Sequence, residues 1–179
     1  MEFEEVEGSR FIEEVDALMK TAFPVDEQVD TSKLIEISRD PKLTFAAFID
    51  NGEFVGLGQW ASDKSMGISN VMYLAVAEEK RSSGYGSKIL KTIVKECDTP
   101  TTVLEVESTK VECPNLEQRL SRKSFYQRND FHEANFSVIY DGVVYDVLYR
   151  GEKISQPKYL DFMEKTWPSG MFDTELFEG

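Results

Sequence analysis

The chain of 179 residues contains only one histidine and two cysteines, Cys97 and Cys113. These three side chains are too few for a convincing metal cluster, so we expect no metal site. No stretch approaches the roughly 18 apolar residues that a membrane-spanning helix needs. The acidic start MEFEEVEGSR also lacks the apolar run of a secretory leader. These absences predict a cytoplasmic protein with reduced thiols and no membrane partner.

Positive charge is scarce as well: 33 Asp and Glu residues outnumber 20 Lys and Arg residues, which gives a net charge of −13. This balance argues against nucleic-acid binding, which relies on a basic surface. The charge is unevenly spread, since residues 1–30 hold ten acids and two bases while residues 77–128 hold eight acids and ten bases. Residues 77–128 suit an anionic ligand, and the more acidic rest of the chain suits a cationic ligand. Ordinary surface charge needed for solubility explains the same counts.

Hydrophobic residues make up 41% of the sequence, which is enough for the core of one domain. Apolar spacing and turn residues predict helices and strands in an order that gives an α+β fold on a mixed sheet. A strand, a helix and a second strand over 69–107 imply a right-handed parallel crossover. Two hairpins are expected to turn at Asn51-Gly52 and near Asp141-Gly142. The predicted helices span about 10–23, 31–39, 85–97 and 115–129.

The sequence divides into a domain over residues 1–150 and a C-terminal extension over residues 151–179. In the extension, Pro157 stands near a helix start and is followed by several apolar residues. This pattern predicts an amphipathic helix over residues 156–166 that covers apolar surface of the domain or of a partner subunit. Both a monomer and a homodimer remain open. The apolar residues are Tyr159, Leu160, Phe162 and Met163.

The stretch RSSGYGSK, residues 81–88, lies between a predicted strand and a predicted helix. The N-terminus of a helix has unpaired N–H groups and a positive dipole end, and glycine lets the backbone approach an anion closely. Arg81 and the neighbouring serines add donors, so the stretch is typical of a phosphate cradle. The alternative is a glycine-containing helix start without a ligand. The P-loop pattern is absent, and Ile89 stands where a dinucleotide fingerprint requires its third glycine.

The stretch LAVAEEKRSSGYGSKIL resembles the acyl-coenzyme A motif of the GNAT superfamily of N-acetyltransferases, Q/R-x-x-G-x-G/A, with Arg81, Gly84 and Gly86 in place. Downstream, RKSFYQRNDF resembles the family's F-Y-x-x-x-G-F, although Asp130 stands where glycine is usual. Arg119 and Arg122 replace the asparagine and alanine often found ahead of that motif. The resemblance covers roughly residues 1–150 and implies the GNAT fold. In that fold a mixed, mostly antiparallel sheet, flanked by helices, splays apart between its fourth and fifth strands.

The resemblance implies acetyl-coenzyme A as the co-substrate. Its pantetheine arm would bind strand-fashion to the backbone of Leu74, Ala75 and Val76. Its pyrophosphate would lie on the N–H groups of the helix start. Arg119, Arg122 and Lys123 either lie near its phosphate or adenine groups or form a solvated helix face. The pyrophosphate residues would be Arg81, Ser82, Ser83, Gly84, Tyr85, Gly86 and Ser87.

The strand TTVLEVE places Glu105 and Glu107 on one face, because side chains alternate along a strand. Burial and like charge would raise a carboxylate pKa toward neutral pH, whereas two glutamates at an exposed strand end would have no catalytic role. The resemblance implies Glu105 as the base, with Glu107 or an ordered water as alternatives. Asn70 stands where other GNAT branches have a catalytic glutamate. The resemblance also implies Tyr126 as the acid that protonates the leaving thiolate.

We therefore expect an N-acetyltransferase that moves an acetyl group from acetyl-coenzyme A to a primary amine by direct attack in a ternary complex. Two rivals remain: a non-catalytic acyl-coenzyme A binding or regulatory module of the same fold, and an interaction protein with a relic cofactor site. An acidic mouth would attract a cationic amine. Polyamine, aminoglycoside, amino acid and peptide N-terminus all remain open as acceptors.

Overall fold

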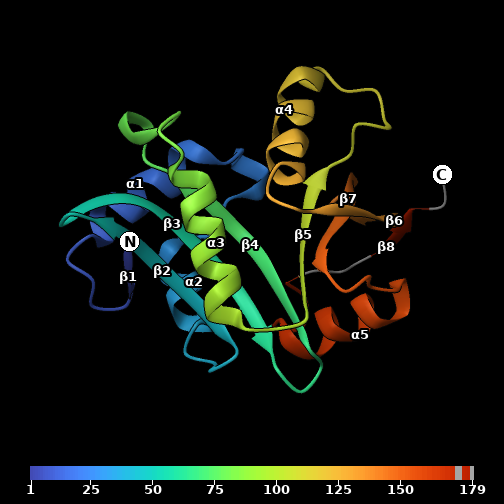
Figure 1. The fold of residues 1–179 in the computed structure, drawn as a ribbon, viewed down its shortest axis with the longest axis horizontal. Coiled ribbons are helices and arrows are strands. Elements are labelled where there is room, and N and C mark those ends of the chain that lie inside the picture. The colour runs from blue at the N-terminus through green and yellow to red at the C-terminus, as the bar shows by residue number, and fades with distance from the viewer. Residues whose placement is uncertain (172–174, 178–179) are drawn as a thin grey trace. The chain divides into compact units, whose positions relative to one another are not determined.

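The computed structural model describes residues 1–171 and 175–177. Its helices and strands belong to two units (Figure 1). The first unit comprises Met1–Ser62 and Val71–Asp98, and the second comprises Asp63–Asn70 and the described residues from Thr99 onward. The chain therefore leaves the first unit after Ser62, returns to it at Val71 and leaves it again after Asp98. Among the helices in the described ranges, none combines the length and the hydropathy needed to cross a bilayer.

The first unit is built on four adjacent strands in the order β1-β2-β3-β4. Antiparallel pairing joins β1 to β2, and β2 to β3. Three helices and two 3-10 turns complete this unit. Its elements are β1 (Glu2–Glu5), α1 (Ile12–Ala22), η1 (Val25–Glu27), α2 (Thr31–Ile37), β2 (Leu43–Asp50), β3 (Glu53–Asp63), β4 (Ile68–Val76), η2 (Glu78–Lys80) and α3 (Tyr85–Cys97).

The hairpin of β2 and β3 turns at Asn51 and Gly52, as the sequence predicts. Both residues have positive φ angles, 52° and 81°. Two consecutive left-handed residues match the twist of the flanking strands, which is why the Asn-Gly pair favours this turn. The turn sets a register that runs from Asp50 opposite Glu53 to Leu43 opposite Ala61.

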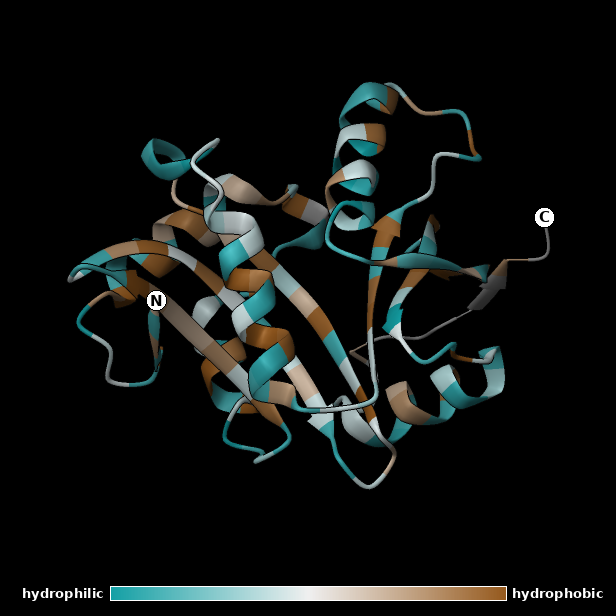
Figure 2. Ribbon diagram, viewed as in Figure 1, coloured by the Kyte–Doolittle hydropathy of each residue, from teal (hydrophilic) through white to brown (hydrophobic). Residues whose placement is uncertain are grey.

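Helix α3 packs closely on the sheet of the first unit because two strand positions lack side chains. A Cβ atom at Gly56 would lie 2.8 Å from Ile89, and one at Gly58 would lie 2.9 Å from Ile93. Both isoleucines are fully buried. Figure 2 shows apolar residues along the strands beneath α3 and an alternation of polar and apolar residues along the helix itself. The helix predicted over residues 85–97 therefore packs on the sheet through its apolar face.

The second unit orders its strands β4-β5-β7-β6-β8. The start of β4 pairs in parallel with β5 over three residue pairs, from Ile68 opposite Thr101 to Asn70 opposite Val103. The other pairings, β5 with β7, β7 with β6, and β6 with β8, are antiparallel. Apart from the start of β4, its elements are β5 (Thr101–Glu107), α4 (Leu116–Gln127), β6 (His132–Tyr140), β7 (Val143–Gly151), α5 (Gln156–Thr166) and β8 (Glu175–Phe177).

The turn that leads into β4 is fixed by local hydrogen bonds. The Asp63 carboxylate accepts from the backbone N–H of Ser65 at 2.9 Å and of Met66 at 3.1 Å. Beyond the turn, the Ser69 hydroxyl donates to the Thr102 hydroxyl oxygen at 3.0 Å, which joins β4 to β5 through side chains as well as backbone. Residues 63–70 thus form a well-defined part of the second unit.

The α+β fold with mixed, mostly antiparallel strands is confirmed, as is the C-terminal helix over residues 156–166. The second predicted hairpin also forms, with Asp141 and Gly142 at φ angles of 47° and 77°. The short strand β8 was not predicted. Its three residues pair with Ser137, Val138 and Ile139 of β6, a distant partner that local sequence does not reveal. Residues 172–174 and 178–179 of the expected extension lie outside the described residues.

Candidate functional site

The segment between β4 and α3 adopts the left-handed backbone that glycine favours. Ser82 has a φ of 61°, and Gly84, which precedes the first residue of α3, has a φ of 81°. A Cβ atom at Gly84 would meet no atom within 4 Å, so the space beside this residue is open. The first turn of a helix presents N–H groups and the positive dipole end. This end of α3 can therefore receive an anion.

The predicted cofactor residues lie in one segment of the first unit: Leu74, Ala75 and Val76 at the end of β4, and residues 81–87, which lead into the first turn of α3. Arg81 is exposed but folds back, so that its Nε donates to the carbonyl oxygen of Val76 at 3.3 Å. The resemblance assigns that carbonyl to pantetheine, and in this structure it already has a partner. The Tyr85 hydroxyl donates to the Asp50 carboxylate at 2.8 Å and ties the helix start to β2.

In the second unit, Glu105 lies on β5 and is partly buried. The side-chain amide of Asn70 donates to both of its carboxylate oxygens, at 3.2 and 3.1 Å, and the Tyr159 hydroxyl donates to Oε1 at 2.7 Å. Burial raises the pKa of Glu105, while the hydrogen bonds from Tyr159 and Asn70 oppose that rise. Among the described residues, its hydrogen-bond partners are neutral groups. A carboxyl with a raised pKa and neutral partners holds a proton more readily than an exposed glutamate, as a general base must.

Glu107, two residues further along β5, has a different environment. Its side chain is 8% exposed, and each carboxylate oxygen meets one guanidinium at 2.9 Å: Oε1 contacts Arg119 and Oε2 contacts Arg122. Both arginines come from α4. Arg119 also donates to the carbonyl oxygen of Ser108 at 2.9 Å. Glu107 therefore fixes α4 to the end of β5 through charge-assisted hydrogen bonds.

Tyr126 lies near the end of α4, with its ring centroid 5.1 Å from that of Phe125 and 5.9 Å from that of Phe131. Burial raises the pKa of Tyr126 to about 12, the positive charge of Arg122 opposes this rise, and the negative charge of Glu105 adds to it. The phenol is therefore protonated at neutral pH and close enough to Glu105 to respond to its charge.

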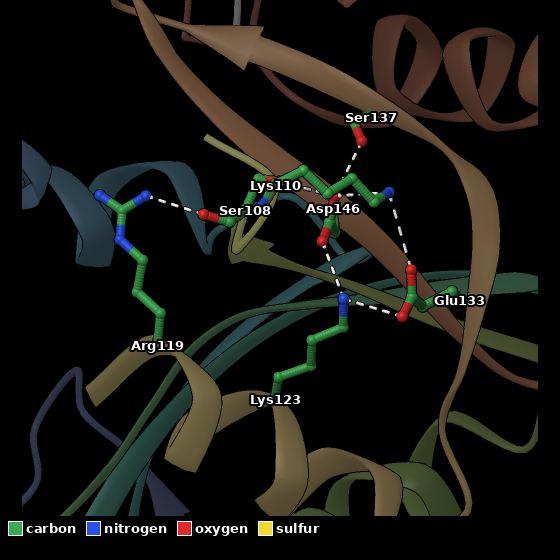
Figure 3. A network of polar contacts seen from close by, with 7 residues as sticks. All are labelled: Ser108, Lys110, Arg119, Lys123, Glu133, Ser137 and Asp146. Carbon is green, nitrogen blue, oxygen red and sulfur yellow. Dashed lines mark hydrogen bonds and ion pairs between the residues drawn. The ribbon is translucent and has the colours of Figure 1, made fainter. Parts of the chain in front are cut away.

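A polar network around the buried Asp146 holds α4 and the segment after β5 against β6 and β7 (Figure 3). At its centre, Asp146 has a side chain only 1% exposed and accepts hydrogen bonds from Ser137 at 2.8 Å and from Lys123 at 3.0 Å. Ser108 and Lys110 complete the contacts to Asp146. Although burial alone would raise the pKa of Asp146, these four donors lower it below its usual value. The network fixes the helix that carries Tyr126.

The structure corrects the interpretation of the basic side chains on α4. The sequence allowed Arg119, Arg122 and Lys123 to line a phosphate site or to form a solvated helix face. Instead the two arginines pair with Glu107, and Lys123 pairs with Asp146 and Glu133. Sequence spacing could not reveal these pairs, because each joins a helix residue to a residue of another element, and helical spacing does not determine how the two elements pack.

The departure at Asp130 from the glycine of the family motif is accommodated. Asp130 has a φ of 67°, which places it in the left-handed region that glycine favours. Aspartate is one of the few other residues that adopt this conformation readily. The turn between α4 and β6 is thus preserved, and Phe131 is buried behind it.

Sequence reasoning missed Tyr159 and the donor role of Asn70. The resemblance marks Asn70 only as the residue that stands in place of a catalytic glutamate, yet its amide nitrogen donates to both oxygens of Glu105. Tyr159 was counted among the apolar residues of the C-terminal helix. A tyrosine on the buried face of an amphipathic helix is a usable signal, because its hydroxyl then requires a partner in the interior. Within residues 1–171 and 175–177, no group of three metal-ligating side chains is found.

A family model described as an acetyltransferase (GNAT) domain matches residues 41–133. That span contains the open start of α3 as well as Glu105, Glu107 and Tyr126, and it ends before β7 and α5. No curated protein sequence matches the chain.

Solved structures with the same fold include a putative GNAT acetyltransferase from Bacteroides thetaiotaomicron, which is 19% identical with a TM-score of 0.73 and covers 92% of this chain and 95% of its own. An aminoglycoside 6'-N-acetyltransferase complexed with coenzyme A is 16% identical with a TM-score of 0.65, and the match covers 88% of this chain and 99% of that enzyme. A spermidine N-acetyltransferase chimera from Vibrio cholerae and hSSAT is 15% identical with a TM-score of 0.63, and the match covers 89% of this chain and 98% of the chimera. At these identities the likeness shows a shared fold.

Proposed function

The chain belongs to the GNAT family of acetyltransferases, and we propose that it transfers an acetyl group from acetyl-coenzyme A to a primary amine by direct attack in a ternary complex. One observation carries the proposal: Glu105 is a partly buried carboxylate with a raised pKa, and neutral donors hold it in place. Such a group suits the removal of a proton from an ammonium ion, which must lose that proton before it can attack a thioester.

For the donor, the open start of α3 would hold the pyrophosphate of acetyl-coenzyme A on the N–H groups of residues 81–87. The pantetheine arm would run along the backbone of Leu74, Ala75 and Val76 in the manner of an added strand. Because Arg81 now donates to the Val76 carbonyl, we propose that its side chain moves to a phosphate when the ligand binds. The exchange replaces a neutral carbonyl acceptor by an anionic one, and an ion pair with phosphate is stronger than a hydrogen bond to a carbonyl.

For the base, Glu105 is favoured over Glu107 because of their partners. Both oxygens of Glu107 are engaged by arginines, so protonating it would leave two cations without their counter-charge. Glu105 would take the proton of the ammonium directly or through an ordered water. The neutral amine then attacks the thioester carbonyl and forms a tetrahedral intermediate.

For the acid, Tyr126 would donate its phenolic proton to the sulfur as the carbon–sulfur bond breaks. Its pKa of about 12 keeps that proton on the oxygen until the thiolate forms. Arg122 moderates the negative charge that develops on the phenol, since its positive charge acts to lower the Tyr126 pKa. As the intermediate collapses, the nitrogen loses its remaining extra proton, and that proton restores the Tyr126 phenol through solvent. The products are the N-acetyl amine and free coenzyme A.

The acceptor is proposed to be a cationic amine. The net charge of −13 and the acid-rich first thirty residues support this choice. Relatives of the same fold include enzymes named for aminoglycosides and for spermidine, and both are polycationic amines. The small number of cysteines, two in 179 residues, suits a reducing compartment, and we propose the cytoplasm. Residues 1–150 would form the acetyltransferase domain and residues 151–179 its extension.

A screen of amines that follows the release of free coenzyme A thiol tests the proposal. We expect thiol release that depends on both acetyl-coenzyme A and one class of amine. The rival, a non-catalytic acyl-coenzyme A binding module, would bind acetyl-coenzyme A and release no thiol with polyamines, aminoglycosides, amino acids or peptides. Absence of binding as well as turnover would favour the interaction protein with a relic cofactor site.

A further inference from the structure

Tyr159 belongs to the C-terminal helix α5 and is fully buried. Its hydroxyl donates to Oε1 of Glu105 at 2.7 Å and lies 2.7 Å from the Tyr140 hydroxyl on β6. Its ring centroid lies 5.5 Å from that of Phe136, also on β6. Because the Tyr159 proton points to Glu105, Tyr140 is the donor in the pair of phenols. A chain of two phenols therefore ends on the candidate base.

The packing of α5 fixes this hydroxyl in place. Pro157 lies in the first turn of the helix, where its restricted φ favours the start. The buried face of α5 comprises Tyr159, Phe162, Met163 and Thr166. A phenol anchored on a packed helix loses little further freedom when it donates a hydrogen bond, which is the requirement for an effective positioning group.

We propose that Tyr159 is a positioning residue for the base: it orients the Glu105 carboxylate and stabilises its charged form, so that α5, which lies outside the family match, is required for proton transfer. The role assigned to Glu105 rests on the proposed function. The contact between Tyr159 and Glu105 does not, and it can be tested separately.

The groups around Glu105 explain why one hydroxyl matters. Asn70 on β4 and Tyr159 on α5 donate to the carboxylate, and Tyr126 on α4 interacts with its charge. On β7 its register partner is Val147, which is apolar. The pKa of Tyr159 is raised well above its usual value, chiefly by burial, so the phenol remains a donor throughout the working pH range. The hydrogen bond from Tyr159 lowers the pKa of Glu105, whereas burial raises it. Removing the Tyr159 hydroxyl would therefore let the pKa of Glu105 rise further.

The test is to replace Tyr159 by phenylalanine and to follow the Glu105 carboxyl carbon by NMR in protein labelled with ¹³C-glutamate. The signal is assigned through Glu105→Gln. We expect Tyr159→Phe to raise the titration midpoint of Glu105 by about one to two pH units, the size of one hydrogen bond to a charged group. An unchanged midpoint in a folded variant would overturn the proposal.

Two control variants and one further test variant separate positioning from general destabilisation. Tyr149→Phe removes a hydroxyl from β7, where the ring packs beside His132, and should leave the Glu105 midpoint unchanged. Phe162→Leu loosens the buried face of α5 and should lower the melting temperature without moving the midpoint. Tyr140→Phe removes the outer phenol and should raise the midpoint by a smaller amount, which keeps the test open if Tyr159→Phe unfolds. A fall in the midpoint of Tyr140→Phe would contradict the direction of donation from Tyr140 to Tyr159 and overturn the proposal.

Turnover gives the second measurement. An ionised base requires the rate to rise with pH through the Glu105 pKa, so Tyr159→Phe should move this acidic limb to higher pH. The loss of kcat/KM should be roughly 10- to 100-fold on the limb and should shrink toward the alkaline plateau. A uniform loss at all pH values would indicate a structural role only and overturn the proposal. If the wild-type protein releases no thiol with any amine, the proposed function fails, and the carboxyl titration still decides whether Tyr159 controls Glu105.

Discussion

Glu105 and Tyr126 both have raised pKa values, with opposite chemical consequences. For a carboxyl group, a rise brings the pKa nearer to neutral pH and makes the group a better proton acceptor. For a phenol, a rise moves the pKa away from neutral pH and keeps the proton in place. Burial is the largest cause in both cases. One partly dehydrated region thus prepares an acceptor and a donor at the same time.

Tyr126→Phe should lower turnover about 10²- to 10⁴-fold, the usual contribution of a general acid. The change removes one hydroxyl and keeps the ring packed between Phe125 and Phe131. Affinity for acetyl-coenzyme A, measured by calorimetry, should stay the same, because the lost interaction forms in the transition state. Turnover within a factor of two of wild type would show that the thiolate leaves without this proton.

Glu105→Gln and Glu107→Gln should differ in both activity and stability. Because the folded-state pKa of Glu105 is raised, its ionisation opposes folding as pH rises through that pKa. We therefore expect Glu105→Gln to leave the melting temperature at pH 8 unchanged or to raise it. The same variant should abolish the acidic limb of the pH–rate profile. Glu107→Gln should lower the melting temperature, because it leaves Arg119 and Arg122 without their counter-charge.

Rate measurements on the same pair of variants identify the base. If Glu107→Gln removes the acidic limb and Glu105→Gln does not, the base lies two residues further along β5. If neither removes it on a confirmed acceptor, the amine reaches the site already deprotonated.

Much of this site could be predicted from sequence, because the residues on one strand face follow from local alternation. The contacts between different elements could not be predicted in this way. The alternation of TTVLEVE places Glu105 and Glu107 on one face, and that is a local property of a strand. The different environments of the two carboxylates depend on which helix packs beside each. Glu107 meets arginines of α4, while Glu105 meets a tyrosine of α5 that lies 54 positions away in sequence. No spacing rule in a single sequence reports such pairings.

At the scale of elements, turn chemistry explains the predictions that succeeded. The Asn51-Gly52 and Asp141-Gly142 turns have two left-handed residues each, and their sequences favour that conformation. The start of α3 depends on Gly84 in the same way. In contrast, β8 is only three residues long and depends on the exposed edge of β6 for its pairing. Local propensity therefore identified the hairpins and gave no signal for β8.

Gly84→Asp should abolish the rise in melting temperature that acetyl-coenzyme A produces in the wild-type protein. It places a negative charge where the pyrophosphate is proposed to bind. A ligand at 100 times its Kd stabilises the folded state by about 2.7 kcal/mol, so the shift is measurable. Gly8→Asp is the matched control, since Gly8 has the same φ of 81° and equally open surroundings.

Both glycine variants should lose a similar and small amount of stability, because aspartate adopts a positive φ more readily than most residues but less readily than glycine. Only Gly84→Asp should lose the response to acetyl-coenzyme A. A full ligand shift in Gly84→Asp, or its loss in Gly8→Asp, would exclude the start of α3 as the phosphate site.

Deleting residues 155–179 should unfold or aggregate the protein. Among the residues removed, Tyr159, Phe162, Met163 and Trp167 are buried, and each large buried side chain contributes about 1.5–3 kcal/mol. Their sum is comparable to the roughly 5–15 kcal/mol that holds a whole domain together. Size-exclusion chromatography and thermal melting measure the outcome. A truncated protein that stays soluble, in the same assembly state and equally stable would contradict this prediction.

At the scale of the whole molecule, the net charge of −13 should affect encounter with the acceptor more than the chemical step. For a multiply charged amine, kcat/KM should fall as salt rises from about 0.01 M to about 0.1 M, where the screening length shrinks from about 30 Å to about 10 Å. A singly charged amine provides the control and should show a weaker dependence. Equal salt dependence for the two amines would show that the acidic surface has no part in acceptor capture.

Residues 63–70 interrupt the first unit in sequence but belong to the second. A gene split after Asp98 would therefore not yield two independent halves. The fragment from Thr99 onward would lack Ile68–Asn70, so the edge of β5 that these residues cover would be open to pairing with other chains. It would also lack Asn70 and leave Glu105 without that donor. The second unit thus includes eight residues that precede the last segment of the first unit in sequence, so any split version must carry 63–70 with the second half.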